Sequence, residues 1–192
     1  MNKVEIFEKE LSYIKNSKYL ESAKVMLELL PDYFFSIPAS STGKYYPSFA
    51  QGDMGLVRHT KVAVRFCYEL SNNNSVGHSF SSDEKDLMLI ALLMHDGCKS
   101  GIEKSKYTKV DHPLIVSELI KNNKDKIGLS DGEISFVCSV IDSHMGEFNK
   151  DYNGNEVLPV PKNKFQRFVH MCDYLASKKF IDVKFDNNDI LD

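Results

Sequence analysis

Tryptophan is absent from the 192-residue sequence, and cysteine is scarce. The four cysteines lie about 30–40 residues apart and form no C-x-x-C pair, so the sequence indicates neither a zinc knuckle nor a compact disulfide framework. Three of them continue apolar helical faces. We therefore expect buried free thiols in a reducing environment.

Long apolar runs are also missing. No stretch reaches the roughly 18 apolar residues that a membrane span needs, and the first residues are acidic rather than forming a signal-peptide core. A net charge of −3 and an isoelectric point near 6.1 argue against a surface built throughout to bind nucleic acid, although a local basic groove stays open. We expect a cytoplasmic protein with no membrane partner. No pattern indicates an oligomeric state.

Helical periodicity is present, without a convincing alternating strand. With 42% hydrophobic residues, 192 residues are enough for one well-filled domain and too few for two ordinary ones. We expect an all-α bundle of about six or seven helices over residues 1–192, with long functional loops. Residues 1–30 form a helical N-terminal extension, residues 30–180 the core, and residues 180–192 a frayed acidic tail.

The chain is organised around the apolar stretch of residues 87–94. Its helix-forming residue types predict a helix buried on every side. The stretch ends in His95 and Asp96, and Gly97 follows where a left-handed helix cap favours glycine. A carboxylate at this end faces the negative pole of the helix dipole. It costs about 0.3–1 kcal/mol unless a positive group, such as a metal cation, compensates it.

Further helices bring polar residues inward. Periodicity predicts one or two helices over 4–30, and helices over 56–70, 112–120, 133–143 and 164–179. His59 and Asp173 lie on the apolar stripes of two of these helices. His112 begins one helix, and His144 follows the end of another. A carboxylate that faces the core unpaired costs several kcal/mol or takes up a proton.

The connection over residues 31–55 is unusually long, and such loops are often functional. It is not a nucleotide-binding P-loop, because Pro38 stands where that pattern requires glycine. We expect Lys44 and Tyr45 to contact a substrate, with Tyr46 as a further candidate. Residues of a solvated loop need no such role, and the same holds for the lysines of residues 99–109.

Each polar residue has an ordinary structural explanation when taken alone, such as a histidine that bonds a backbone carbonyl. Together they form a pattern drawn from five segments: His59, His95, Asp96, His112, His144 and Asp173. Imidazole and carboxylate groups are the ligands that Mn, Fe, Ni, Zn or Mg sites use. The joint pattern therefore favours a metal centre.

The order His, His-Asp, His, His, Asp resembles the HD-domain superfamily of metal-dependent phosphohydrolases. Residues 55–60 (GLVRHT) resemble the first-histidine motif of that family, and residues 95–99 (HDGCK) resemble its His-Asp-x-x-Lys motif. Residues 38–39, 144–147 and 170–176 are most similar to the HD domain of bacterial 3′-to-5′ exoribonucleases. This chain departs from those enzymes at Tyr45 and Tyr46, which replace a histidine pair, and it has no room for their added OB domain.

The resemblance implies a site with one or two divalent ions. Each ion is one of six metals: Mn, Fe, Ni, Co, Mg or Zn. The first ion is held by four residues: His59, His95, Asp96 and Asp173. In binuclear relatives the positions of His112 and His144 hold a second ion that Asp96 bridges, whereas in mononuclear relatives they contact phosphate.

Further roles follow from the same resemblance. Asp96 and Lys99 are the expected catalytic residues, with Lys99 contacting the phosphate as a point charge. His170 lies one helical turn before Asp173, and it either orients that ligand from behind or simply packs.

The implied activity is hydrolysis of a phosphoester or phosphoanhydride by a metal-activated water. The expected substrate is a nucleotide or a related small phosphorylated molecule. Two alternatives remain open. One is a compact 3′-to-5′ nuclease on short single-stranded nucleic acid, with loop tyrosines as stacking platforms. The other is a non-catalytic module that binds a nucleotide.

Overall fold

The computed structural model describes residues 2–191 and confirms the all-α fold. Six helices of eleven or more residues lie in this range: α3 (Ser17–Leu29), α4 (Gly55–Asn72), α6 (Ser82–Met94), α7 (His112–Asn122), α9 (Asp131–Asp142) and α10 (Lys164–Ala176). Shorter elements connect them: α1 (Lys3–Ile6), α2 (Glu8–Leu11), η1 (Asp32–Phe35), η2 (Ser48–Ala50), α5 (Asn74–Gly77) and α8 (Lys124–Ile127). Within residues 2–191, no helix is both long and apolar enough to cross a membrane.

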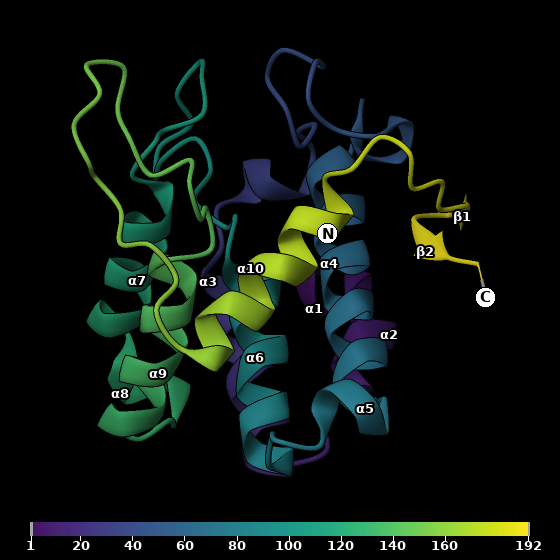
Figure 1. Ribbon diagram of the computed structural model, residues 1–192, viewed down its shortest axis with the longest axis vertical. Helices are drawn as coiled ribbons and strands as arrows, with labels where there is room; N and C mark the ends of the chain where they lie inside the picture. Colours follow the sequence, from purple (N-terminus) through teal and green to yellow (C-terminus); the bar gives the residue numbers. More distant parts are fainter. Residues whose placement is uncertain (1, 192) are drawn as a thin grey trace.

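Helix α6 is the centre of the bundle, as its apolar sequence predicts. Every residue from Asp86 to Ser100 is buried. The helix packs against α3, α4, α9 and α10. Figure 1 shows α6 between α4 on one side and α9 on the other, with α10 crossing in front. Because α6 is surrounded in this way, the polar residues at its C-terminal end are buried as well.

Capping boxes begin three helices that lead to the candidate site. Ser81 caps α6, Ser130 caps α9 and Asn163 caps α10, each paired with a Glu or Gln three residues later. The side chain at the cap bonds a backbone N–H, and the later residue bonds back to the cap. These local bonds fix where each helix starts.

Gly97 does not form the left-handed cap that the sequence predicts. Positive φ angles occur at six other glycines, among them Gly146 with φ of 59°. A Cβ atom at Gly97 would lie 2.4 Å from Leu30 Cδ2 and 3.0 Å from the Met94 carbonyl oxygen. Close packing against the end of α3, rather than a left-handed turn, therefore requires the glycine.

The tail differs from the frayed segment that we expected. Strands β1 (Phe185–Asp186) and β2 (Asp189–Ile190) form an antiparallel hairpin. Its turn residues Asn187 and Asn188 have φ angles of 46° and 70°, which suit a tight hairpin turn. Phe185 and Ile190 pack against the core, and Arg58 of α4 donates to Asn188 Oδ1 at 2.6 Å. The tail is therefore anchored to α4.

Candidate metal centre

The six candidate ligands meet at one end of the bundle. His59 lies near the start of α4, His95 caps the end of α6 and His112 begins α7. The other members are Asp96, His144 after α9, and Asp173 on α10. All four histidines and Asp96 are at most 2% exposed, and the Asp173 side chain is 14% exposed. Figure 1 shows three long loops gathered at this end of the helices.

Asp96 lies between two groups of histidines. Its Oδ2 atom is 3.6 Å from His95 Nε2 and 3.7 Å from His59 Nε2. Its Oδ1 atom is 2.9 Å from His112 Nε2 and 3.7 Å from His144 Nε2. The two oxygens of one carboxylate thus face two separate sets of nitrogen atoms, as a bridging ligand would.

Two compact donor sets exist in the described residues. His59, His95 and Asp173 offer ligand atoms that all lie within 4.8 Å of one another, and so do His95, Asp96 and His144. In the first set, Asp173 Oδ1 is 2.9 Å from His59 Nε2 and 3.4 Å from His95 Nε2. His112 belongs to neither compact set, although it contacts Asp96. These buried groups are compatible with binding a metal ion.

Backbone carbonyls fix the tautomers of three histidines. The Nδ1 atoms of His95, His112 and His144 lie 2.6, 2.7 and 2.8 Å from carbonyl oxygens three residues earlier in the chain. A carbonyl only accepts, so Nδ1 carries the hydrogen in each neutral ring. The Nε2 lone pair is then free and faces the two carboxylates. Metal-ligating histidines are typically held in this way.

This donor arrangement fits a divalent cation. Within residues 2–191, the buried atoms His95 Nε2, His112 Nε2 and Asp96 Oδ1 have no hydrogen-bond partner, whereas His59 Nε2 lies within hydrogen-bond distance of Asp173 Oδ1. Lone pairs on nitrogen and on carboxylate oxygen cannot satisfy one another without a positive charge between them. A cation satisfies both, and imidazole with carboxylate suits first-row divalent metals.

The electrostatics of the cluster also favour a positive charge. Burial opposes ionisation of Asp96 and Asp173. Even so, Lys99 and neighbouring imidazoles hold the pKa of the Asp96 carboxyl well below its usual range, and His59 and His95 do the same for Asp173. Burial lowers the pKa of His59 and of His112, which keeps both rings neutral. For His95 burial acts in the same direction, but Asp96 and Asp173 outweigh it and raise the pKa of the ring. Two ionised carboxylates therefore attract either a proton or a cation to this position.

Lys99 and Tyr46 complete the polar surroundings. The Lys99 ammonium donates to Asp96 Oδ2 at 2.5 Å and to the Tyr46 hydroxyl at 3.1 Å. Burial opposes the charge on Lys99, but Asp96 raises the pKa of the amine. The Tyr46 ring stands edge-on to His59, with 4.8 Å between ring centroids, and burial raises the pKa of its phenol to about 12. Lys99 therefore stays cationic and Tyr46 stays protonated near neutral pH.

Three sequence-predicted contacts lie elsewhere. Lys44 is exposed and Tyr45 is 72% exposed, so the next residue, Tyr46, reaches the centre in their place. His170 does not orient Asp173, because its Nδ1 lies 2.6 Å from the His144 carbonyl oxygen. A Cβ atom on Gly146 would lie 2.3 Å from the His170 ring. His170 therefore packs on the turn that carries His144.

Sequence reasoning missed Tyr33 of η1. The Tyr33 hydroxyl donates to the Gly101 carbonyl oxygen at 2.5 Å and accepts the Ser100 backbone N–H at 3.0 Å. These bonds hold the turn that follows Asp96 and Lys99. No periodicity marks Tyr33, because its partners lie far along the chain.

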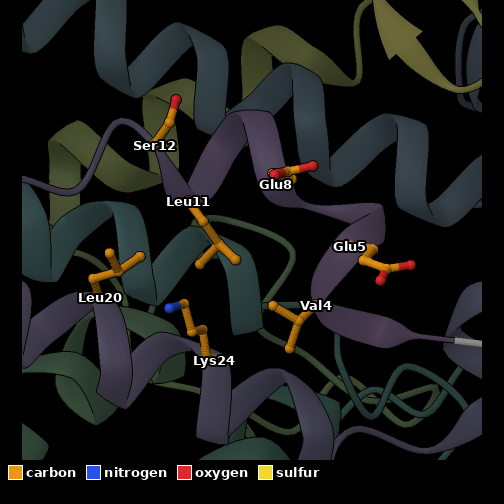
Figure 2. Close-up of a pocket in the computed structure, with 7 residues that line it drawn as sticks. All are labelled: Val4, Glu5, Glu8, Leu11, Ser12, Leu20 and Lys24. Atoms are coloured by element: carbon orange, nitrogen blue, oxygen red, sulfur yellow. The ribbon is translucent and has the colours of Figure 1, made fainter.

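A surface hollow of about 250 Å³ lies away from the centre, between α1, α2 and α3. Figure 2 shows the apolar side chains of Val4, Leu11 and Leu20 around it, together with charged Glu5, Glu8 and Lys24. None of the candidate ligands lines this hollow, so it is separate from the histidine–aspartate centre.

Comparison of the sequence with models of known protein families gives no match, and neither a curated protein nor a solved structure matches the chain. The site therefore stands on its own geometry.

Proposed function

We propose that the protein is a metal-dependent phosphohydrolase of the HD type, acting on a nucleotide or a related small phosphorylated molecule. One observation supports this most strongly. Three histidines are held by backbone carbonyls so that their Nε2 lone pairs face two ionised carboxylates, beside a buried lysine. A structural core gains nothing from uncompensated lone pairs, whereas a metal site requires them.

We assign the ligands as follows. One divalent ion is held by His59, His95, Asp96 and Asp173. A second is held by His112 and His144 together with Asp96, whose two oxygens face the two sets. When bound, such ions neutralise phosphate oxygens and lower the pKa of water toward about 7, so no side-chain nucleophile is needed.

The protein's own groups bind and orient the phosphate. Lys99 is held by Asp96 and presents a positive charge beside the ligands, where it stabilises negative charge on phosphate oxygens. The almost complete burial of Asp96 and Lys99 excludes bulk water, which strengthens these interactions.

The test is metal content measured by elemental mass spectrometry after incubation with Mn²⁺ and desalting. Wild-type protein should retain close to two ions per chain, and His112→Ala should retain about one. Asp96→Asn should lose both ions, because it removes the charge that faces both sets. The matched control is His78→Ala, which removes an exposed histidine outside the cluster and should leave the metal content unchanged.

Turnover is measured on the same proteins with nucleotides, p-nitrophenyl phosphate and short single-stranded oligonucleotides. Wild-type protein should hydrolyse at least one phosphorylated compound, and Asp96→Asn should fall to the buffer background. Wild-type protein that retains no metal contradicts the proposal. Retained metal without any turnover would instead support a non-catalytic binding module, and degradation of oligonucleotides alone would support the nuclease alternative.

A further inference from the structure

Tyr46 and Tyr45 are adjacent, yet their side chains have opposite environments. Tyr45 is 72% exposed, whereas the Tyr46 ring packs edge-on against His59 and its hydroxyl contacts Lys99. A tyrosine turned into a cluster of ligands carries a polar hydroxyl into a buried site. Such a hydroxyl needs partners for both its oxygen and its hydrogen.

The loop that carries Tyr46 is fastened to α4. Arg58, next to His59, donates to the carbonyl oxygens of Phe49 at 2.5 Å, Gln51 at 2.8 Å and Asp53 at 2.8 Å. The Gln51 side chain in turn donates to the Tyr46 carbonyl oxygen at 3.2 Å. The loop that carries Tyr46 is thus held by the helix that supplies His59.

Two hydrogen-bond donors beside Asp96 have no acceptor among the described residues: one N–H of Lys99 and the O–H of Tyr46. The Lys99 ammonium has three N–H groups, and Asp96 and Tyr46 accept two of them. The Tyr46 oxygen accepts from Lys99, so its own O–H hydrogen remains to be donated. Within residues 2–191 neither of these two hydrogens has an acceptor. Both sit beside the bridging carboxylate Asp96.

We propose that Tyr46 is a phosphate-binding residue of this site, and that its O–H and the remaining N–H of Lys99 bind oxygens of one phosphate group. This inference rests on the proposed function. Lys99 supplies the charge, and Tyr46 supplies an O–H donor on a ring that packs against His59. A phosphate group with at least two free oxygens is the ligand that this pair fits.

The experiment uses full-length, manganese-loaded protein as wild type, Tyr46→Phe and the control Tyr152→Phe, whose tyrosine is 92% exposed. Binding of inorganic phosphate is measured by isothermal titration, and manganese per chain by elemental mass spectrometry. Tyr46→Phe should keep the wild-type manganese content but bind phosphate about 10-fold more weakly, as expected for loss of one hydrogen bond to a charged group. With p-nitrophenyl phosphate, the loss should appear in KM more than in kcat.

Two results would overturn the inference alone. In one, Tyr46→Phe binds phosphate as tightly as wild type and Tyr152→Phe. In the other, Tyr46→Phe loses manganese together with phosphate, which would show that the ring only supports His59. In both cases the wild-type metal content and turnover are unaffected. Wild-type protein that holds no manganese would overturn the proposed function and this inference together.

Discussion

Helix α4 contributes to two buried polar clusters that differ in how their charges are satisfied. His59 belongs to the histidine–aspartate centre. Lys61, two residues later, belongs to a second group with Glu10 and Asp189, which we call the Lys61 cluster. Residues two apart on a helix point to different faces, so the two clusters lie on different sides of α4.

The Lys61 cluster pairs its charges, although neither Glu10 carboxylate oxygen has a hydrogen-bond partner within residues 2–191. The Lys61 ammonium lies 3.5 Å from Glu10 Oε2 and forms an ion pair with Asp189. Lys61 and Glu10 are each 1% exposed, while the Asp189 side chain is 58% exposed. Burial raises the pKa of Glu10, and Lys61 offsets this only in part. Excess negative charge is therefore removed by a proton at Glu10 or screened by solvent at Asp189.

In the histidine–aspartate centre the negative charge is not balanced by the protein's own cations. Its two carboxylates stay ionised, one lysine is present, and the remaining groups are imidazoles whose lone pairs point inward. Lys61 and Glu10 are as buried as the candidate ligands, so burial alone does not separate a structural cluster from a binding site. The kind of nitrogen separates the two, because an ammonium supplies positive charge, whereas the lone pair of a neutral imidazole binds a positive charge from elsewhere.

The largest expected effect comes from removing the cation of the Lys61 cluster. Lys61→Met leaves Glu10 buried without its partner and should lower the free energy of unfolding by about 3–5 kcal/mol, measured by denaturant titration. Metal content should stay at the wild-type value, because the ligands face another side of α4.

Two further variants sharpen the Lys61→Met experiment. Lys121→Met removes an exposed helical lysine and should change stability by less than about 0.5 kcal/mol. Adding Glu10→Leu to Lys61→Met should recover much of the loss, since replacing both partners removes the unpaired charge. A loss of metal in Lys61→Met would show instead that the two clusters are coupled through α4.

Removing metal from the histidine–aspartate centre should have the next largest effect on stability. A ligand present at 100 times its dissociation constant stabilises the folded state by about 2.7 kcal/mol. For a chain of this size, chelation should therefore lower Tm by about 5–10 °C. Wild type and Lys61→Met should show the same shift in a thermal melt with and without EDTA. Asp96→Asn should show none, and an unchanged wild-type Tm would count against a bound metal.

The sequence alone predicted the features that depend on a local pattern of residues. Eight apolar residues in a row predicted that α6 is buried on all sides, and apolar spacing placed His59 and Asp173 inward. We expected the six candidate ligands to lie together because their order resembles that of the HD-domain superfamily, and a resemblance of this kind relates distant segments. Periodicity alone shows which face of a helix is buried, but not which other segment packs against that face.

What the sequence did not predict depends on contacts between distant segments. Adjacent loop residues have no periodicity to tell them apart, so the sequence offers both Tyr45 and Tyr46 and does not show that Tyr46 is the one that reaches Lys99. The Lys61–Asp189 ion pair joins residues 128 positions apart, and without it the acidic tail was expected to fray. Gly97 shows the same limit, because its close neighbour Leu30 lies just after the end of α3, far away along the chain.

The smallest expected effect concerns the pH dependence of the Lys61 cluster. Burial raises the pKa of Glu10 above its ordinary 4.5 in the folded protein. The stabilising contribution of protonated Glu10 is therefore complete below 4.5, and it is lost as the pH rises through the folded pKa. Glu10→Gln is permanently neutral, so its free energy of unfolding relative to wild type should increase between about pH 4 and about pH 7. Glu8→Gln, at an exposed position of the same helix, is the matched control, and a Glu10→Gln slope no steeper than this control would mean that Lys61 keeps Glu10 ionised.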